Sequence, residues 1–288
     1  SAFENSASTI VLLTMSISDS GTTRESQIVL SGIQVAVPTF LMLAVCIQLA
    51  EESAEQRAVL DGRSLPEVVV TVAGSLLYTT VGAVSLLNIR QDVGLTPRMA
   101  YTNSFMCWSA FFFGFIQIYT DSMAGVRWPL KFDYWFTLPN FGWGIEWGLH
   151  LLAGVNGEVC GLRAAILMGM SIASIGLEYI VPGKMGYNLA ILPQVLGAIL
   201  MSVYCIRSYY SEQATRALYI FLIACIAFLV LHEIDGFLPV ALTEATGYET
   251  GKIVVIKLSD NTQIYFSIRF FVEMFRTKRR LQLKEKSL

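Results

Sequence analysis

Charged side chains are scarce in this chain, and their scarcity argues against an ordinary soluble fold. Asp, Glu, Lys and Arg make up 15% of the 288 residues, whereas hydrophobic residues make up 54%. Soluble domains usually carry about 25% charged residues. The hydrophobic residues fall in runs of about 20, the length of a helix that spans a bilayer. The sequence therefore predicts an all-α integral membrane protein with a lipid bilayer as its surroundings. The net charge of −2 provides no basic surface for nucleic acid.

Residues that bind metals or perform nucleophilic chemistry are also few. All five cysteines lie in or at the ends of hydrophobic runs, without a Cys-x-x-Cys pair, as is typical of small buried side chains. The only histidines, His150 and His232, fall near opposite membrane faces in the topology below, which argues against a shared metal site. No phosphate-binding loop or nucleophile elbow occurs. The chain thus carries no catalytic motif of its own, and an attached enzyme domain stays an open question.

Eight hydrophobic segments are long enough to cross a membrane. They are predicted at 28–50, 67–89, 99–121, 128–151, 161–182, 187–206, 216–238 and 253–275. Residues 1–27 form a Ser/Thr-rich N-terminal arm, and residues 276–288 form a tail rich in Lys and Arg. Basic residues concentrate on the cytoplasmic side of membrane proteins, so the tail is predicted to be cytoplasmic. With an even number of crossings, the N-terminus is then cytoplasmic too.

Two carboxylates are predicted to lie at similar depth in the membrane. Asp133 and Asp260 follow the starts of their segments, near 128 and 253, and a rise of 1.5 Å per residue places them roughly 8 and 10 Å deep. Ionisable side chains inside spans are costly and mark functional sites. Like charges in a dry site need a cation or a shared proton. We therefore predict one site that holds both residues. A structural polar pair, or an ion pathway without a cofactor, stays as the alternative.

The sequence Asp-Tyr-Trp-Phe-Thr-Leu-Pro, from Asp133 to Pro139, resembles the third transmembrane helix of microbial (type 1) rhodopsins. The resemblance covers residues 67–275 and implies a seven-helix bundle around retinal, with the segment at 28–50 as an extra N-terminal helix. It implies that Asp133 is the main counterion and first proton acceptor of a retinal Schiff base, and that Asp260 is the second counterion. The implied chromophore-binding residues are Tyr134, Trp135, Thr137, Leu138, Pro139, Gln263 and Ile264.

The lysine that would carry the retinal is absent from the last predicted helix. The family places it four residues after the Asp, where this chain has Ile264 after Gln263. Either the lysine is lost, or a retinal-modified lysine between Gln263 and Ile264 was dropped from the printed sequence. We favour the second explanation, because one inserted residue puts the following residues in the register of the family. If no lysine is missing, Lys257 is the other lysine near Asp260 on this segment, and we expect its side chain to snorkel to the membrane interface.

The resemblance implies a retinal-binding photoreceptor. The extra helix and the basic tail favour the sensor domain of an enzyme rhodopsin, which would feed a C-terminal cyclic-nucleotide enzyme domain, and a homo-oligomer is expected. Gly144 occupies the position where proton-pumping members often have their internal donor. It disfavours an efficient pump, but a light-driven proton pump or light-gated channel stays as the first alternative. A chromophore-free membrane transporter or structural subunit is the second.

Overall fold

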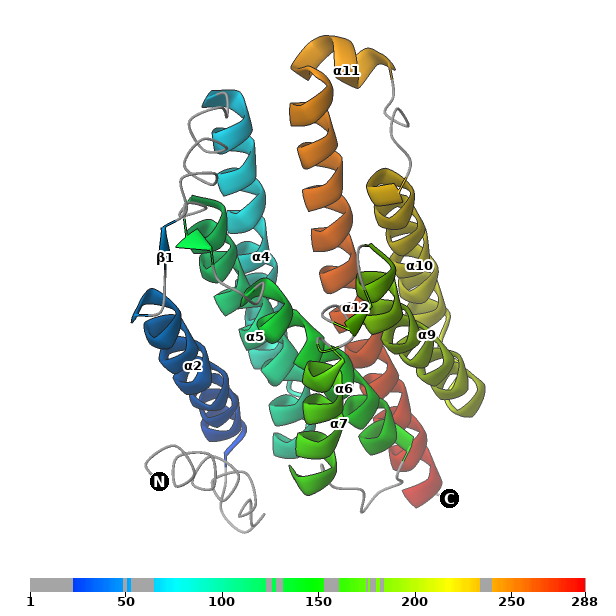
Figure 1. Cartoon of the computed structure of the whole chain (residues 1–288). Helices are drawn as coiled ribbons and strands as arrows, with labels where there is room; N and C mark the ends of the chain where they lie inside the picture. Colours follow the sequence, from blue (N-terminus) through cyan, green and yellow to red (C-terminus); the bar gives the residue numbers. More distant parts are fainter. Residues whose placement is uncertain are drawn as a thin grey trace.

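The chain is folded into a bundle of long helices that run side by side (Figure 1). The computed structural model describes residues 23–48, 51–52, 65–122, 126–127, 132–152, 161–174, 176, 180–181, 184–233 and 240–287. The helices are α2 (Arg24–Gln48), α4 (Leu65–Gln91), α5 (Pro97–Ser122), α6 (Phe132–Leu152), α7 (Gly161–Ala173), α9 (Lys184–Ser208), α10 (Glu212–Glu233), α11 (Val240–Thr246) and α12 (Tyr248–Lys286). Two-residue strands, β1 (Glu51–Glu52) and β2 (Val126–Arg127), pair antiparallel.

Helix α12 lies in the middle of the bundle and organises it. In Figure 1 it runs the full height of the molecule, with α4 and α5 on one side and α9 and α10 on the other. It packs against α10 and α4, and also contacts α5, α6 and α11. Other close pairs include α4 with α5, α2 with α5, α6 with α7, α6 with α9 and α5 with α6. Side chains of α12 can therefore meet side chains from both halves of the chain.

The buried face of α4 is made of small and polar residues, whereas its exposed face is apolar. The buried residues recur every three or four positions, as the period of a helix requires: Thr71, Gly74, Ser75, Tyr78, Gly82, Ser85 and Ile89. Val69, Leu76 and Leu87 are 47–56% exposed. Soluble helices bury their apolar stripe, whereas membrane helices place small residues between helices and apolar residues toward lipid. In the part of the chain that the structure describes, α4 is the one helix that is both long enough and apolar enough to cross a membrane by length and composition alone.

Glycines bring α4 and α5 into backbone contact. A Cβ atom at Gly82 would lie 2.6 Å from the carbonyl oxygen of Cys107 and 2.7 Å from the Cα of Phe111. A Cβ atom at Gly114 would meet the carbonyl of Ser75, at 2.7 Å, and Thr79. Real Cβ atoms do not come so close to backbone atoms, so neither position accepts a larger residue unless the helices separate. Such small-residue contacts are how helices pack when lipid, not water, surrounds them.

Polar contacts link α2, α6, α12 and the loop between α4 and α5 at the end of the bundle where α2 begins. Arg276 Nε donates to Asp92 Oδ2 at 2.5 Å, and Arg276 Nη1 donates to Glu273 Oε1 at 2.6 Å. Arg24 Nη1 donates to the carbonyl oxygen of Asp92 at 2.6 Å. Lys278, 2% exposed, donates to the carbonyl of Leu151 at 2.5 Å, in the last turn of α6. A cation at a helix C-terminus satisfies carbonyls that have no partner within the helix.

Replacing Lys278 tests this contact. We expect Lys278→Met to lower the free energy of unfolding by about 1–3 kcal/mol, since buried carbonyls at the end of α6 lose their donor. Burial lowers the pKa of Lys278 below its usual 10.5. Between the lowered and the usual pKa the unfolded chain binds more protons than the folded protein, so this lysine makes the free energy of unfolding rise with pH.

The measurement is thermal unfolding of the full chain in detergent across that alkaline range. Lys278→Met should lose the rise with pH. Lys284→Met, which changes an exposed lysine further along α12, is the matched control and should keep it. Indistinguishable pH profiles for the two variants would contradict the assignment.

The prediction of an all-α protein is confirmed, apart from the two-residue strands. The rhodopsin-like architecture is not supported, as the comparisons below explain, and the eight membrane crossings stay a prediction. The long helices fall close to the predicted segments, with two differences, and the short helix α11 lies between two predicted segments. Helix α12 continues from the segment at 253–275 through the basic tail to Lys286, because no Gly or Pro interrupts residues 252–286. Helix α7 ends at Ala173, well before the predicted end at 182.

Candidate functional site

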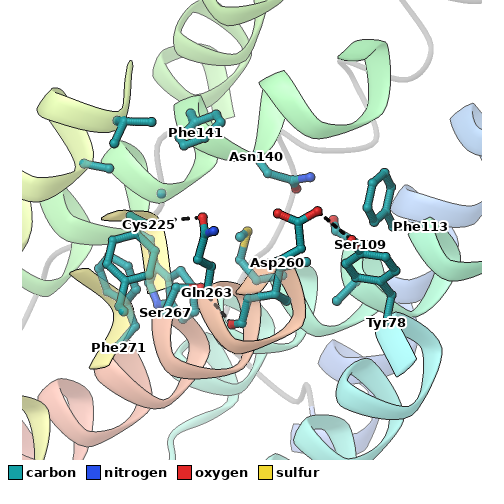
Figure 2. A pocket seen from close by; sticks show the side chains of 18 residues that line it. Tyr78, Ser109, Phe113, Asn140, Phe141, Cys225, Asp260, Gln263, Ser267 and Phe271 are labelled. Carbon is teal, nitrogen blue, oxygen red and sulfur yellow. Dashed lines mark hydrogen bonds between the residues drawn. The ribbon is translucent and has the colours of Figure 1, made fainter. Parts of the chain in front are cut away.

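A cavity of about 240 Å³ lies inside the bundle, and α4, α5, α6, α9, α10 and α12 line it (Figure 2). Most of its wall is apolar, formed by side chains such as Met106, Phe113, Phe141, Val195, Phe221 and Phe271. Its polar lining residues are Tyr78, Ser109, Asn140, Asp260, Gln263 and Ser267. Ligand sites are typically apolar cavities of about 300–1,000 Å³ with a few placed polar groups. At about 240 Å³ this cavity is slightly smaller than that range.

The carboxylate of Asp260 forms the most polar corner of the cavity. The hydroxyl of Tyr78 donates to Asp260 Oδ2 at 2.7 Å. Tyr78 is 1% exposed, and the edge of its ring packs against Phe113, with the ring centroids 4.8 Å apart. Figure 2 shows the Asn140 side chain, on α6, extending toward Asp260, on α12. Three helices thus bring polar groups to one point, where they can hold the polar end of a ligand.

Lys257 lies beside this corner, one turn before Asp260 on α12 and near the ring of Tyr78. Lys257 Nζ donates to Gln117 Oε1 at 3.0 Å and to Ser75 Oγ at 3.4 Å, and it lies 5.6 Å from the centroid of the Tyr78 ring. Its stem packs on Gly74, where a Cβ atom would lie 2.7 Å from Lys257 Cγ. The expectation that Lys257 snorkels outward is therefore wrong. The ammonium finds partners inside the bundle, because Gly74 leaves room for the stem.

Gln263 and Cys225 form the side of the cavity between α12 and α10. Cys225 Sγ donates to Gln263 Oε1 at 3.4 Å, and Gln263 Nε2 donates to the carbonyl of Ala224 at 3.4 Å. The amide of Gln263 is thereby held in one orientation. Ile264 follows it on the wall and packs against the hydrophobic core. This side of the cavity is mostly apolar and is fixed by hydrogen bonds to α10.

Three glycines of α6 have different surroundings. A Cβ atom at Gly142 would lie 2.5 Å from backbone atoms of Leu167 on α7, and one at Gly148 would collide with Met201 on α9. A Cβ atom at Gly144 would meet nothing within 4 Å. Gly142 and Gly148 are therefore packing positions, whereas Gly144 opens onto the cavity that it lines.

Trp147 lines the cavity one turn further along α6. Its side chain is fully buried at 0% exposure, and its ring stacks on Phe271 with centroids 4.0 Å apart and planes at 16°. Its indole Nε1 is buried and has no hydrogen-bond partner among the residues that the structure describes. Most buried polar groups in proteins are paired, so this group requires an explanation.

The structure brings together some of the residues predicted from the sequence. Asp260, Gln263 and Ile264 line the cavity, and Pro139 precedes Asn140 of its wall. The side chains of the other predicted site residues lie outside the described part of the chain, although their backbone belongs to α6: Asp133, Tyr134, Trp135, Thr137 and Leu138. The predicted proximity of Asp133 and Asp260 thus stays a prediction. Sequence reasoning missed Tyr78. The signal that could have found it is the recurrence of small and polar residues every three or four positions on α4, which marks the buried face of that helix.

The expected extra lysine is not supported. Gln263 and Ile264 are consecutive residues in the middle of α12, which is uninterrupted from Tyr248 to Lys286. Ile264, Ser267 and Phe271 continue the cavity-lining face begun by Asp260. The chain therefore offers no lysine at the position where the rhodopsin family binds retinal.

Comparisons with known proteins point to a different family. The family model of the TMEM187 protein family matches residues 27–272 of this chain. The chain is similar to Transmembrane protein 187 of Homo sapiens, with 28% identity over 207 residues that cover 70% of this chain and 73% of the human protein. No solved structure matches.

These matches overturn the relation to microbial rhodopsins. The expected retinal, its Schiff base, the counterion roles of Asp133 and Asp260, the photoreceptor activity and the enzyme-rhodopsin sensor domain are therefore wrong. The light-driven pump and the light-gated channel are overturned with them, and a chromophore-free transporter gains no support, whereas a structural membrane subunit is compatible with the family. A short run of aromatic residues, Thr and Pro resembled the family because these residues are common in membrane helices.

Proposed function

Since the chain belongs to the TMEM187 protein family, we propose that it is a multi-pass membrane protein that binds a small amphiphilic molecule in the cavity between its helices. The observation that carries this proposal is the cavity itself, whose wall is mostly apolar and which has a polar corner formed by Asp260, Tyr78 and Asn140. An apolar wall binds a hydrocarbon body, and placed polar groups orient its head.

The proposed membrane topology has eight crossings, with both ends of the chain in the cytoplasm. It is supported by the apolar exposed faces of the helices, such as Ile223 and Ile226 on α10, which are 66% and 62% exposed. Successive long helices run in alternating directions, and the start of α2 lies at the same end of the bundle as the end of α12 (Figure 1). That end carries the basic residues that favour the cytoplasmic side.

The chemistry of the corner favours a ligand whose head donates hydrogen bonds. A carboxylate accepts hydrogen bonds through two oxygens, and Tyr78 occupies one position at Oδ2 of Asp260. A ligand hydroxyl or ammonium can donate to the same carboxylate. The side-chain carbonyl of Asn140 can accept a second hydrogen bond from the same head. Of the residues predicted from the sequence, this proposal retains Asp260, Gln263 and Ile264 as cavity residues.

A cavity-filling substitution tests the proposal. We expect Gly144→Leu to remove ligand binding, because its side chain would occupy the cavity without striking the backbone of another helix. The probe is dodecanol, which has a hydrocarbon body and one hydroxyl. A ligand present at 100 times its dissociation constant stabilises a protein by about 2.7 kcal/mol. The measurement is the rise in the thermal midpoint of the full chain on addition of dodecanol.

Gly169→Leu is the matched control. Gly169 lies on α7, is exposed, and also has nothing within 4 Å of an added Cβ atom, so the same chemical change is made outside the cavity. This control should respond to dodecanol like the parent protein. A parent protein that dodecanol does not stabilise, or a Gly144→Leu variant that responds like Gly169→Leu, would overturn the proposal.

A further inference from the structure

The C-terminal end of α12 carries more positive charge than its contacts neutralise. Of the six basic residues between 276 and 286, Arg276 binds Asp92 and Glu273. Lys278 binds carbonyl oxygens at the end of α6. The other four, called the basic cluster here, form no ion pair within the described part of the chain: Arg279, Arg280, Lys284 and Lys286.

The rotation of the helix turns the basic cluster away from the bundle. Lys278 is 2% exposed, contacts the end of α6 and lies 5.9 Å from the centroid of the Tyr209 ring, so its direction marks the inner side of α12. At about 100° per residue, Arg280 and Lys284 lie about 200° and 240° from Lys278, on the opposite side of the helix. Both are exposed. The other two members of the cluster lie at about 100° and 80°.

The acidic residue of this segment lies on the inner side. Glu285 is the one acidic residue between 277 and 287, and it follows Lys278 by about two helical turns, so the two share a side of the helix. Burial, and then Cys205 and Glu285, raise the pKa of the Tyr209 hydroxyl, which places Glu285 near the loop between α9 and α10. The outward side of this segment therefore carries no acidic side chain that could neutralise the basic cluster.

The basic cluster lies where lipid headgroups are expected. The predicted membrane segment ends at Phe275, and α12 continues beyond it without a break. Headgroups add roughly 5–8 Å to each side of the hydrocarbon core. A rise of 1.5 Å per residue puts Arg279 and Arg280 about 6 and 8 Å past Phe275, within the headgroup layer. Lys284 and Lys286 lie about 14 and 17 Å past it, roughly one Debye length beyond that layer.

We propose that the end of α12 binds anionic phospholipids of the cytoplasmic leaflet through the basic cluster. The proposal rests on the proposed topology but not on the ligand of the cavity, because the residues that line the cavity belong to other parts of the helices. The phosphate groups of such lipids are negative and lie at the depth of the nearest arginines. Guanidinium groups bind phosphate through two parallel hydrogen bonds. Basic clusters that directly follow a membrane helix are attracted to anionic lipid over about a Debye length.

A competition between two lipids tests the proposal. The full chain is reconstituted in nanodiscs that contain equal amounts of anionic dioleoyl-phosphatidylserine and zwitterionic dioleoyl-phosphatidylcholine, and native mass spectrometry gives the ratio of the lipids that stay bound. Each basic residue at a membrane surface contributes about 5-fold to the binding of anionic lipid. We expect the parent protein to prefer phosphatidylserine by about 25-fold or more, because two arginines lie at headgroup depth. Arg279→Gln with Arg280→Gln should remove most of this preference, whereas Lys284→Gln with Lys286→Gln should lower it less than about 5-fold.

Matched variants separate the basic cluster from the general charge of this end of the bundle. Arg279→Lys with Arg280→Lys keeps the charge and should keep the preference. Arg207→Gln with Arg216→Gln removes two exposed arginines, at the end of α9 and the start of α10, that flank Glu212, and should lower the preference less than about 2-fold. An equal loss in the two glutamine variants, or a parent protein without a preference for phosphatidylserine, would overturn the inference.

This test is separate from that of the cavity ligand. A parent protein that binds dodecanol but shows no lipid preference would overturn this inference alone, and the opposite result would overturn the proposed function alone. If the variant with glutamine at positions 279 and 280 does not fold, Arg280→Gln changes a single exposed residue and should lower the preference about 5-fold. An unchanged preference in that variant would also contradict the proposal.

Discussion

Arg163→Leu is expected to destabilise the protein by about 3–5 kcal/mol, the largest effect of any single substitution considered for this fold. Glu146, on α6, is fully buried, and Arg163, on α7, binds both of its carboxylate oxygens, at 2.5 and 2.8 Å. Removing the guanidinium leaves a buried carboxylate without this partner, which is far more costly than the net gain from forming the pair. The measurement is the thermal or denaturant-induced unfolding of the full chain in detergent.

The reverse substitution should cost less. After Glu146→Leu the guanidinium of Arg163, whose side chain is 43% exposed, can turn toward solvent or headgroups. The double variant with leucine at both positions should recover most of the stability lost in Arg163→Leu, because it contains no unpaired buried charge. Arg207→Leu, an exposed arginine at the end of α9, is the control and should change stability by less than about 0.5 kcal/mol. A double variant no more stable than Arg163→Leu would show that the ion pair is not the cause.

Gly82→Ala is expected to lower the free energy of unfolding by about 3 kcal/mol. Its methyl group would lie against the backbone of Cys107 and Phe111 on α5, and backbone atoms cannot move aside as the end of a side chain can. Overpacking typically costs about 1–3 kcal/mol, and the upper value applies because α4 and α5 would have to separate along their whole contact.

Gly169→Ala is the comparison for Gly82→Ala. It places the same methyl group on an exposed helix face with nothing within 4 Å. Alanine favours the helix over glycine by up to about 1 kcal/mol, so this variant should be at least as stable as the parent protein. Thermal midpoints of both variants, measured side by side in the same detergent, give the answer. If both variants have the same midpoint, α4 and α5 do not pack through Gly82.

The helices were predictable from the sequence, because each long hydrophobic run has one stable conformation in an apolar environment. Their ends were less predictable. The basic residues after Phe275 indicated a tail, yet α12 continues to Lys286, since Lys and Arg are good helix formers and nothing breaks the helix. A change in charge thus marked the expected membrane boundary but not the end of the helix.

The site was only partly predictable. Asp260 could be selected from the sequence because an ionisable residue in a hydrophobic run is unusual, and it does line the cavity. The direction of Lys257 and the unpaired N–H of Trp147 depend on how each helix is rotated about its axis, which a uniformly hydrophobic run does not specify. The rhodopsin resemblance failed because it rested on common residue types, while the lysine that performs the chemistry of that family was missing.

Contacts hold helix α12 in position at two places along its length. Near one end of the cavity Tyr78 binds Asp260, and Asn261 Nδ2 donates to the carbonyl of Gly74 at 3.2 Å. Beyond the other end of the cavity, Arg276 binds Asp92 in the loop between α4 and α5, and Lys278 binds the end of α6. A helix held by such contacts at two places can neither slide along its axis nor rotate about it unless one set of contacts breaks. The position of Asp260 is therefore fixed. A ligand whose hydrocarbon chain is too long for the cavity must displace walls formed by the other helices rather than the wall formed by α12.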